Sequence, residues 1–162
     1  MKILYIARHA KSERTFDKPD EERLVTDVGV ERTKKIGSIL KSNNAIPQRI
    51  ISSSAERAYT TSLVFADQLS VEQKNIETNK HFYLGSAEQI CDEIRSYDDI
   101  IDNLMIVGHN PQFTDIANYF VNDVVDNLPT SGVVIVKFNT DNWENIDKSN
   151  AELQFKIWPG ML

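Results

Sequence analysis

The sequence has little of several features that mark special classes of protein. It has a single cysteine, Cys91, so no internal disulfide and no cysteine metal cluster can form. Cys91 falls in a helical pattern, where we expect it to be a small buried hydrophobe. Its 6 glycines and 5 prolines form no linker or low-complexity tract. The first apolar run, Ile3 to Ala7, is too short for a signal-peptide core or a membrane span. These features together predict a cytoplasmic protein.

Positive charge is also in short supply. The chain has 24 acidic and 18 basic residues, a net charge of -6. Nucleic acids and anionic membranes are bound through clustered Lys and Arg, so neither is an expected general partner, although local positive patches remain compatible with this balance. Zinc needs three or four suitable ligands, and His9 and His109 have no carboxylate partner at a suitable spacing. The GxxxxGK[ST] phosphate loop of nucleotide triphosphatases is missing as well. We expect neither a metal nor a cofactor.

What the sequence does contain is an alternation of strand and helix patterns. A chain of 162 residues with 41% hydrophobic residues fits one domain, residues 1–162. Strands are expected at 2–7, 49–52, 75–78, 104–107, 132–138 and 151–158. The alternation predicts an α/β fold with three layers, in which helices cover both faces of a mostly parallel central sheet of about six strands.

Capping residues mark where the helices between these strands begin. Four starts are expected: at Thr26, after the serine run 52–54, at Ser86 with Gln89 as a capping box, and at Asn110 with Pro111 in the first helical position. Before the first helix lies the long polar loop "RHAKSERTFDKPDEERLV". A loop of this length without structure of its own is uncommon unless it has a function.

Four side chains with useful chemistry follow the ends of three predicted strands. Arg8 and His9 end the first strand, Arg57 lies in the first turn after the second, and His109 follows 104–107. In a parallel sheet these positions share one edge, where ligands bind. Guanidinium groups and helix N-termini both favour phosphate. A cation such as Arg57 is poorly placed at a helix N-terminus, which indicates a negative group nearby. The sequence therefore predicts a phosphate site.

Three segments, "ARHAKS" (7–12), "SSSAERA" (52–58) and "VGHNP" (107–111), resemble the histidine phosphatase superfamily. "VTDVGVERTKKI", "LPTSGVVIVKF" and the short length are most similar to the SixA-like phosphohistidine phosphatases. The resemblance covers nearly the whole chain and implies a phosphoglycerate mutase-like fold. The superfamily usually has Arg-His-Gly where this chain has Ala10, a modest departure that should leave the nucleophile intact.

The resemblance also implies a role for each candidate residue. His9 is the expected nucleophile, which takes up the phosphoryl group and then loses it to water. Arg8, Arg57 and His109 are expected to bind the phosphoryl oxygens, and His109 would help most when protonated. Ser12 is a further candidate phosphate ligand, or else a solvated loop hydroxyl.

A proton donor for the leaving group is not evident. In the mutase branch a carboxylic acid follows the middle strand, where this chain reads "HFYLGSAEQI". Glu88 is a weak candidate because acids are favoured in a first helical turn anyway. The remaining candidates are loop acids that look the same as solvated charges: Asp17, Asp20, Glu21 and Glu22.

The missing acid favours a particular substrate. An alkoxide leaves poorly because its conjugate acid has a pKa near that of water, about 15.7, whereas the conjugate acid of imidazole has a pKa of roughly 6.5. We therefore expect a phosphohistidine phosphatase that acts on a protein such as a histidine phosphotransfer domain or a sugar-transport phosphocarrier. The alternatives are a phosphatase of the same fold for small phosphomonoesters and a non-catalytic module that binds phosphoproteins. A short chain also leaves little sequence for a lid, which suits a substrate presented by another protein.

Overall fold

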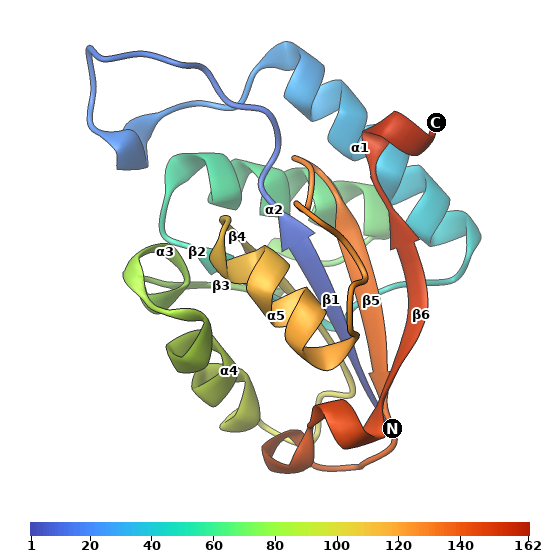
Figure 1. Cartoon of the computed structure of the whole chain (residues 1–162). Helices are drawn as coiled ribbons and strands as arrows, with labels where there is room; N and C mark the ends of the chain where they lie inside the picture. Colours follow the sequence, from blue (N-terminus) through green and yellow to red (C-terminus); the bar gives the residue numbers. More distant parts are fainter.

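A computed structural model describes residues 1–162, which are arranged around one six-stranded sheet (Figure 1). The strands are β1 (Lys2–Arg8), β2 (Arg49–Ser53), β3 (Ile76–Asn79), β4 (Asn103–Gly108), β5 (Val133–Phe138) and β6 (Ala151–Ile157). The helices are α1 (Asp27–Ser42), α2 (Glu56–Leu69), α3 (His81–Leu84), α4 (Ala87–Arg95) and α5 (Gln112–Phe120).

The strand order across the sheet is β3-β2-β4-β1-β5-β6. Neighbours among β3, β2, β4 and β1 are parallel, whereas β5 is antiparallel to both β1 and β6. The predicted α/β fold with a mostly parallel sheet is confirmed, and β5 alone runs against the other strands. It does so because residues 121–132 lead the chain from the end of α5 back to the carboxyl end of β1 (Figure 1). This return segment thereby reaches the edge where the phosphate site is expected.

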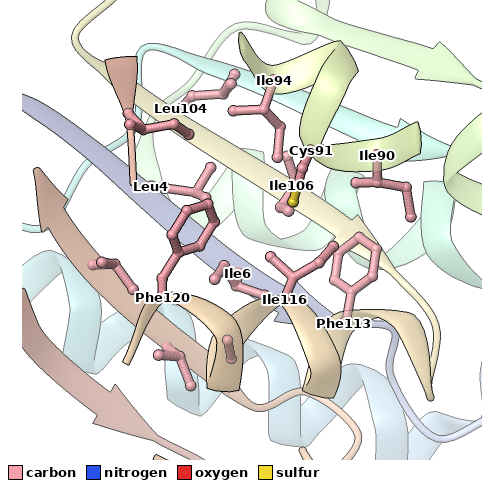
Figure 2. Packing of buried hydrophobic residues seen from close by; sticks show 14 of the residues in the cluster. Leu4, Ile6, Ile90, Cys91, Ile94, Leu104, Ile106, Phe113, Ile116 and Phe120 are labelled. Atoms are coloured by element: carbon pink, nitrogen blue, oxygen red, sulfur yellow. The ribbon is translucent and has the colours of Figure 1, made fainter. Parts of the chain in front are cut away.

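Helices cover both faces of the sheet, as predicted. Helices α1 and α2 pack on one face, and α4 and α5 pack on the other (Figure 1). Side chains along β1 alternate between the two cores: Leu4 and Ile6 face α4 and α5, whereas Tyr5 and Ala7 face α1 and α2. Cys91 of α4 lies in the first core among apolar side chains (Figure 2), and burial raises its pKa to about 11. It is the buried hydrophobe that the sequence indicates.

Two of the expected helix caps are confirmed. Thr26 Oγ1 accepts a hydrogen bond from the Gly29 N–H at 3.0 Å, which begins α1. Ser86 and Gln89 form the predicted capping box of α4, in which each side chain bonds the backbone N–H of the other residue.

The other two helix starts differ from the prediction. The N-cap of α2 is Ala55, and no serine side chain caps the helix. The hydroxyl of Ser53 accepts instead from the Ala55 N–H and contacts His109, so it serves the site and not the helix. Helix α5 begins at Gln112, one residue later than expected, and Asn110 Oδ1 accepts from the Thr114 N–H within its first turn. None of the helices has the length and apolar character needed to cross a membrane.

Candidate active site

The carboxyl ends of β1, β2 and β4 bring the four predicted side chains together. The rings of His9 and His109 lie with their centroids 5.1 Å apart. The N–H of His9 donates to the Gly108 carbonyl at 3.0 Å, which fixes the two histidine segments side by side. Arg57, in the first turn of α2, and Arg8, at the end of β1, are close enough to affect the pKa of His9. The parallel strands thus produce the constellation expected from the sequence.

The backbone after His9 selects its tautomer. His9 Nδ1 lies 2.7 Å from the carbonyl oxygen of Ala10. A carbonyl only accepts, so Nδ1 carries the proton and Nε2 keeps a free lone pair. Thr61 Oγ1 accepts from the Ala10 N–H at 2.8 Å and holds the backbone of Ala10 in place. Ala10 is buried and does not have a positive φ, so alanine fits where the superfamily usually has glycine.

His9 is buried and uncharged at neutral pH. The exposed fraction of this residue is only 7%. The pKa of His9 is lowered to about 4: burial lowers it most, the hydrogen bond to Ala10 opposes this, and the charges of Arg57 and Arg8 also lower it. A neutral imidazole with a free Nε2 lone pair is the form that can attack phosphorus.

His109 is also neutral, which differs from the form expected to help most. Burial lowers its pKa to about 3, and His9 and Arg57 act in the same direction. A bound phosphate dianion would oppose these effects, but the protein alone does not protonate this ring. His109 Nε2 lies 2.7 Å from Ser53 Oγ, while the buried Nδ1 has no partner. Ser53 is a contact that the sequence reasoning missed, because it was assigned to a helix cap.

Glycine is required immediately before His109. A Cβ atom at Gly108 would lie 2.3 Å from Cε1 of Phe113, a core side chain of α5. The absence of a side chain lets β4 end against α5 and so sets the position of His109.

The two arginines are held by one end and leave a nitrogen unpaired. Arg8 Nη1 donates to the Leu128 carbonyl at 3.1 Å, on the segment that returns from α5. Arg57 Nη1 donates to the backbone carbonyl of Asp20 at 2.8 Å, and Nη2 contacts its carboxylate at 3.0 Å. The Nε atoms of both arginines, like Nδ1 of His109, are buried without a hydrogen-bond partner. Buried polar groups are normally paired, so these three nitrogens are sites where the protein leaves hydrogen-bonding capacity unused.

Asp20 supplies the negative group that the position of Arg57 requires. It lies in the 3₁₀ helix Asp20–Glu22 of the long loop, and Tyr83 Oη donates to its Oδ2 at 2.7 Å. Partial burial acts to raise its pKa, but hydrogen bonds from Tyr83 and Arg57 lower it to about 2. The ring of Tyr83 also lies 5.5 Å from that of His109. Sequence reasoning counted Asp20 only as one of several loop acids, although the misplaced charge of Arg57 was a signal for it.

The other candidates are placed in different parts of the molecule. A cavity of about 290 Å³ at the site is lined by Arg8, His9, Lys11, Ser12, Arg14, Arg23 and Thr130. Ser12 therefore reaches the site, in a loop closed by a bridge between Ser12 and Val25. Glu88 lines a separate cavity of about 460 Å³ with Cys91 and other residues of α4 and α5. It is not brought to the histidines. No group of three or more His, Cys, Asp or Glu side chains is arranged to hold a metal ion.

Comparison with known proteins shows which solved structures share this fold. No protein-family model matches the chain. An uncharacterized protein of Mycobacterium leprae, ML1117, is 23% identical over 159 residues, which cover 90% of this chain and 95% of that protein. Among solved structures, a proposed phosphohistidine phosphatase SixA from Nakamurella multipartitia matches with a TM-score of 0.85 and 18% identity, over 98% of this chain and 96% of that one.

Two further SixA structures match over nearly their whole length. The protein histidine phosphatase SixA in complex with tungstate gives a TM-score of 0.82 at 16% identity, over 98% of each chain. A proposed SixA from Agrobacterium tumefaciens gives 0.80 at 20% identity, over 96% of this chain and 97% of that one. The chain therefore has the fold of the SixA histidine phosphatases, as the sequence motifs indicate.

Proposed function

We propose that this protein is a phosphatase that hydrolyses phosphohistidine on another protein through a phosphohistidine intermediate of its own. The observation that carries the proposal is the set of unpaired buried nitrogens on Arg8, Arg57 and His109 beside the neutral His9. A phosphoryl group offers the oxygens that these nitrogens lack, and it places phosphorus within reach of the nucleophile.

The reaction has two steps. His9 Nε2 attacks phosphorus in line, a new N–P bond forms, and the N–P bond to the substrate imidazole breaks. Water then attacks the phosphorylated His9, which releases inorganic phosphate and restores the free imidazole. Arg8, Arg57 and His109 offset the charge on the phosphoryl oxygens in both steps. We infer that the Ser53 hydroxyl donates a hydrogen bond to His109 Nε2, so the proton of the neutral ring lies on Nδ1, where it can bond the phosphate.

The acids near the site support phosphohistidine over an ester. Asp20 is ionised at neutral pH and already accepts bonds from Arg57 and Tyr83. The Tyr83 hydroxyl has its proton committed to Asp20, and Glu88 lines another cavity. Imidazole needs no such donor, because it leaves as a neutral molecule when its other nitrogen carries a proton. A phosphomonoester would leave as an alkoxide and needs one.

The partner and the location remain proposals drawn from the sequence. A histidine phosphotransfer domain or a sugar-transport phosphocarrier is the class of protein that we propose as substrate. The single domain and the cytoplasmic location expected from the sequence stay predictions.

A paired assay tests the proposal. Phosphate release is measured from a histidine-phosphorylated phosphotransfer domain and from a simple phosphomonoester, with wild type and His9→Ala. We expect rapid release from phosphohistidine only, and its loss in the variant. Faster release from the ester would favour the small-molecule phosphatase. Binding of phosphate without release from either substrate would favour the non-catalytic binding module.

A further inference from the structure

The loop between β1 and α1 exposes an aromatic side chain that nothing in the molecule covers. Phe16 has an exposed fraction of 104%. The loop, residues 9–26, extends from the end of β1 beyond the sheet (Figure 1, upper left), and its 3₁₀ helix returns to α2 through the pair of Asp20 with Arg57. Aromatic side chains contribute large apolar areas to protein interfaces and are common among their binding hot spots. An uncovered phenylalanine beside an active site is therefore a candidate anchor for a partner.

The base of the same loop is positively charged on its cavity side. The residues that line the catalytic cavity include Lys11, Arg14 and Arg23, and none of them is a carboxylate. This wall stands out in a chain whose net charge is -6.

Two of these cations have no partner. Lys11 and Arg14 form no ion pair and no side-chain hydrogen bond, whereas Lys18 and Arg23 each pair with a carboxylate of the same loop. One phosphoryl group is already served by other side chains of the site. Lys11 and Arg14 therefore supply positive charge for further anionic groups close to the phosphate.

We propose that residues 11–25 form a docking loop for an acidic face of the substrate protein. Phe16 enters an apolar hollow on that protein, while Lys11 and Arg14 pair with carboxylates next to its phosphohistidine. The inference rests on the proposed function and specifies the partner by its surface: a folded protein whose phosphohistidine is surrounded by acidic residues.

The surroundings of the loop favour a protein over a membrane as the occupant. Asp17, Glu21 and Glu22 are exposed in the same loop but do not line the cavity. A uniformly anionic lipid surface would repel them, whereas a folded protein can place its carboxylates opposite Lys11 and Arg14 alone. On α3, Leu84 is 76% exposed next to Tyr83, which contacts the site through Asp20. Apolar side chains on two elements near the site suit a broad protein face with mixed charge better than a lipid surface.

The test compares substrates of different size and charge. Turnover is measured with free phosphohistidine, with an acidic phosphotransfer domain phosphorylated on histidine, and with the basic protein histone H4 phosphorylated chemically on histidine. We expect wild type to prefer the acidic domain over histone H4. Phe16→Ser should lower kcat/KM for the acidic domain about tenfold, as for loss of an interface anchor, and leave free phosphohistidine unchanged. Arg14→Gln should lower kcat/KM more for the acidic domain than for free phosphohistidine.

A matched control is available at the opposite edge of the sheet, where β4 begins. Ile100 is also exposed, at 77%, but it precedes β4 and so lies at the opposite end of that strand from His109. Ile100→Ser should change neither activity. Equal effects of Phe16→Ser on free phosphohistidine and on the acidic domain would overturn the docking loop while leaving the proposed function intact. Phe16-dependent sedimentation with phosphatidylserine vesicles would also overturn it, in favour of a membrane. If wild type released phosphate from no phosphohistidine substrate, the proposed function itself would fail.

Discussion

The carboxylate of Asp20 lies 3.0 Å from Nη2 of Arg57, and this ion pair joins the long loop to the first turn of α2. The arginine side chain is only 6% exposed, whereas that of Asp20 is 51% exposed. Asp20 accepts one hydrogen bond from each terminal nitrogen of Arg57, and Nε–H has no partner. We infer that Asp20 is a positioning residue, which holds the Arg57 guanidinium in a fixed orientation at the site.

Substitution of Asp20 tests this role. Asp20→Ala should raise KM about tenfold, because Arg57 keeps its bond to the backbone carbonyl but loses the carboxylate that helps to orient it in both the ground state and the transition state. It should cost about 1 kcal/mol of unfolding free energy, a small value because Asp20 is half-exposed. Kinetics with a phosphohistidine substrate and urea unfolding measure the two effects. Asp17→Ala, in the same loop but without such a pair, is the control and should change neither. A loss of kcat with KM unchanged would argue against positioning.

The pH dependence of the first step should reflect the lowered pKa of His9. Because the attacking form is the neutral imidazole, the acid limb of the profile falls only as the pH drops through about 4. An ordinary histidine would lose activity near about 6.5. Rapid-quench measurement of phosphoenzyme formation gives this profile, with circular dichroism at each pH to confirm that the protein stays folded. A midpoint above pH 6 would contradict the burial argument.

The two buried histidines also make the stability depend on pH. In the unfolded chain they bind protons below about 6.5, whereas the folded protein does not protonate His9 until about 4 or His109 until about 3. The unfolded state thus binds more protons, so stability decreases as the pH falls below 6.5. The expected slope is roughly 1.4 kcal/mol per pH unit for each histidine. Urea unfolding between pH 6 and 5 measures it, and the double variant His9→Gln with His109→Gln should flatten the slope. An unchanged slope in that variant would refute the prediction.

The hydroxyl of Ser53 should matter for the chemistry and not only for packing. Ser53→Ala removes the group that lies 2.7 Å from His109 Nε2, so the ring no longer has a fixed tautomer to offer the phosphate. We expect kcat to fall roughly tenfold, at the lower end of the loss seen when supporting groups of an active site are removed. Ser52→Ala is the matched control, because that hydroxyl is buried too but bonds only the Ser53 carbonyl. Similar losses in both variants would reduce Ser53 to a structural role.

A methyl group at Gly108 should disturb the site through the core. Gly108→Ala places Cβ 2.3 Å from the ring of Phe113, so the strand end or the ring must shift. We expect a loss of stability of about 1–3 kcal/mol, typical of an overpacked core, together with reduced activity because His109 follows directly. Thermal unfolding and phosphate release measure both. Gly160→Ala, whose Cβ would meet nothing closer than 3.7 Å, should have little effect. Equal behaviour of the two variants would show that the core can adapt.

Local pattern was sufficient to predict most of the fold and the central residues of the site. Hydrophobic runs located the strands, and Thr26 and Ser86 marked two helix starts, because these signals depend on neighbours within one or two turns. Arg8, His9, Arg57 and His109 could be grouped from sequence because parallel strands end at a common edge. The reversed β5 was not predicted, since the direction of a strand depends on where the preceding connection ends in space.

The sequence by itself thus determined the α/β class and the set of candidate phosphate-binding residues, while the tertiary structure decided how those residues are held and charged. The ion pair of Asp20 with Arg57 and the contact of Ser53 with His109 join segments 37 and 56 residues apart, and no local periodicity encodes such pairings. The low pKa of His9 likewise results from burial among cations brought in from other elements. Residue type fixes what a side chain can do, but desolvation and neighbouring charge, which set its state, exist only once the chain has folded.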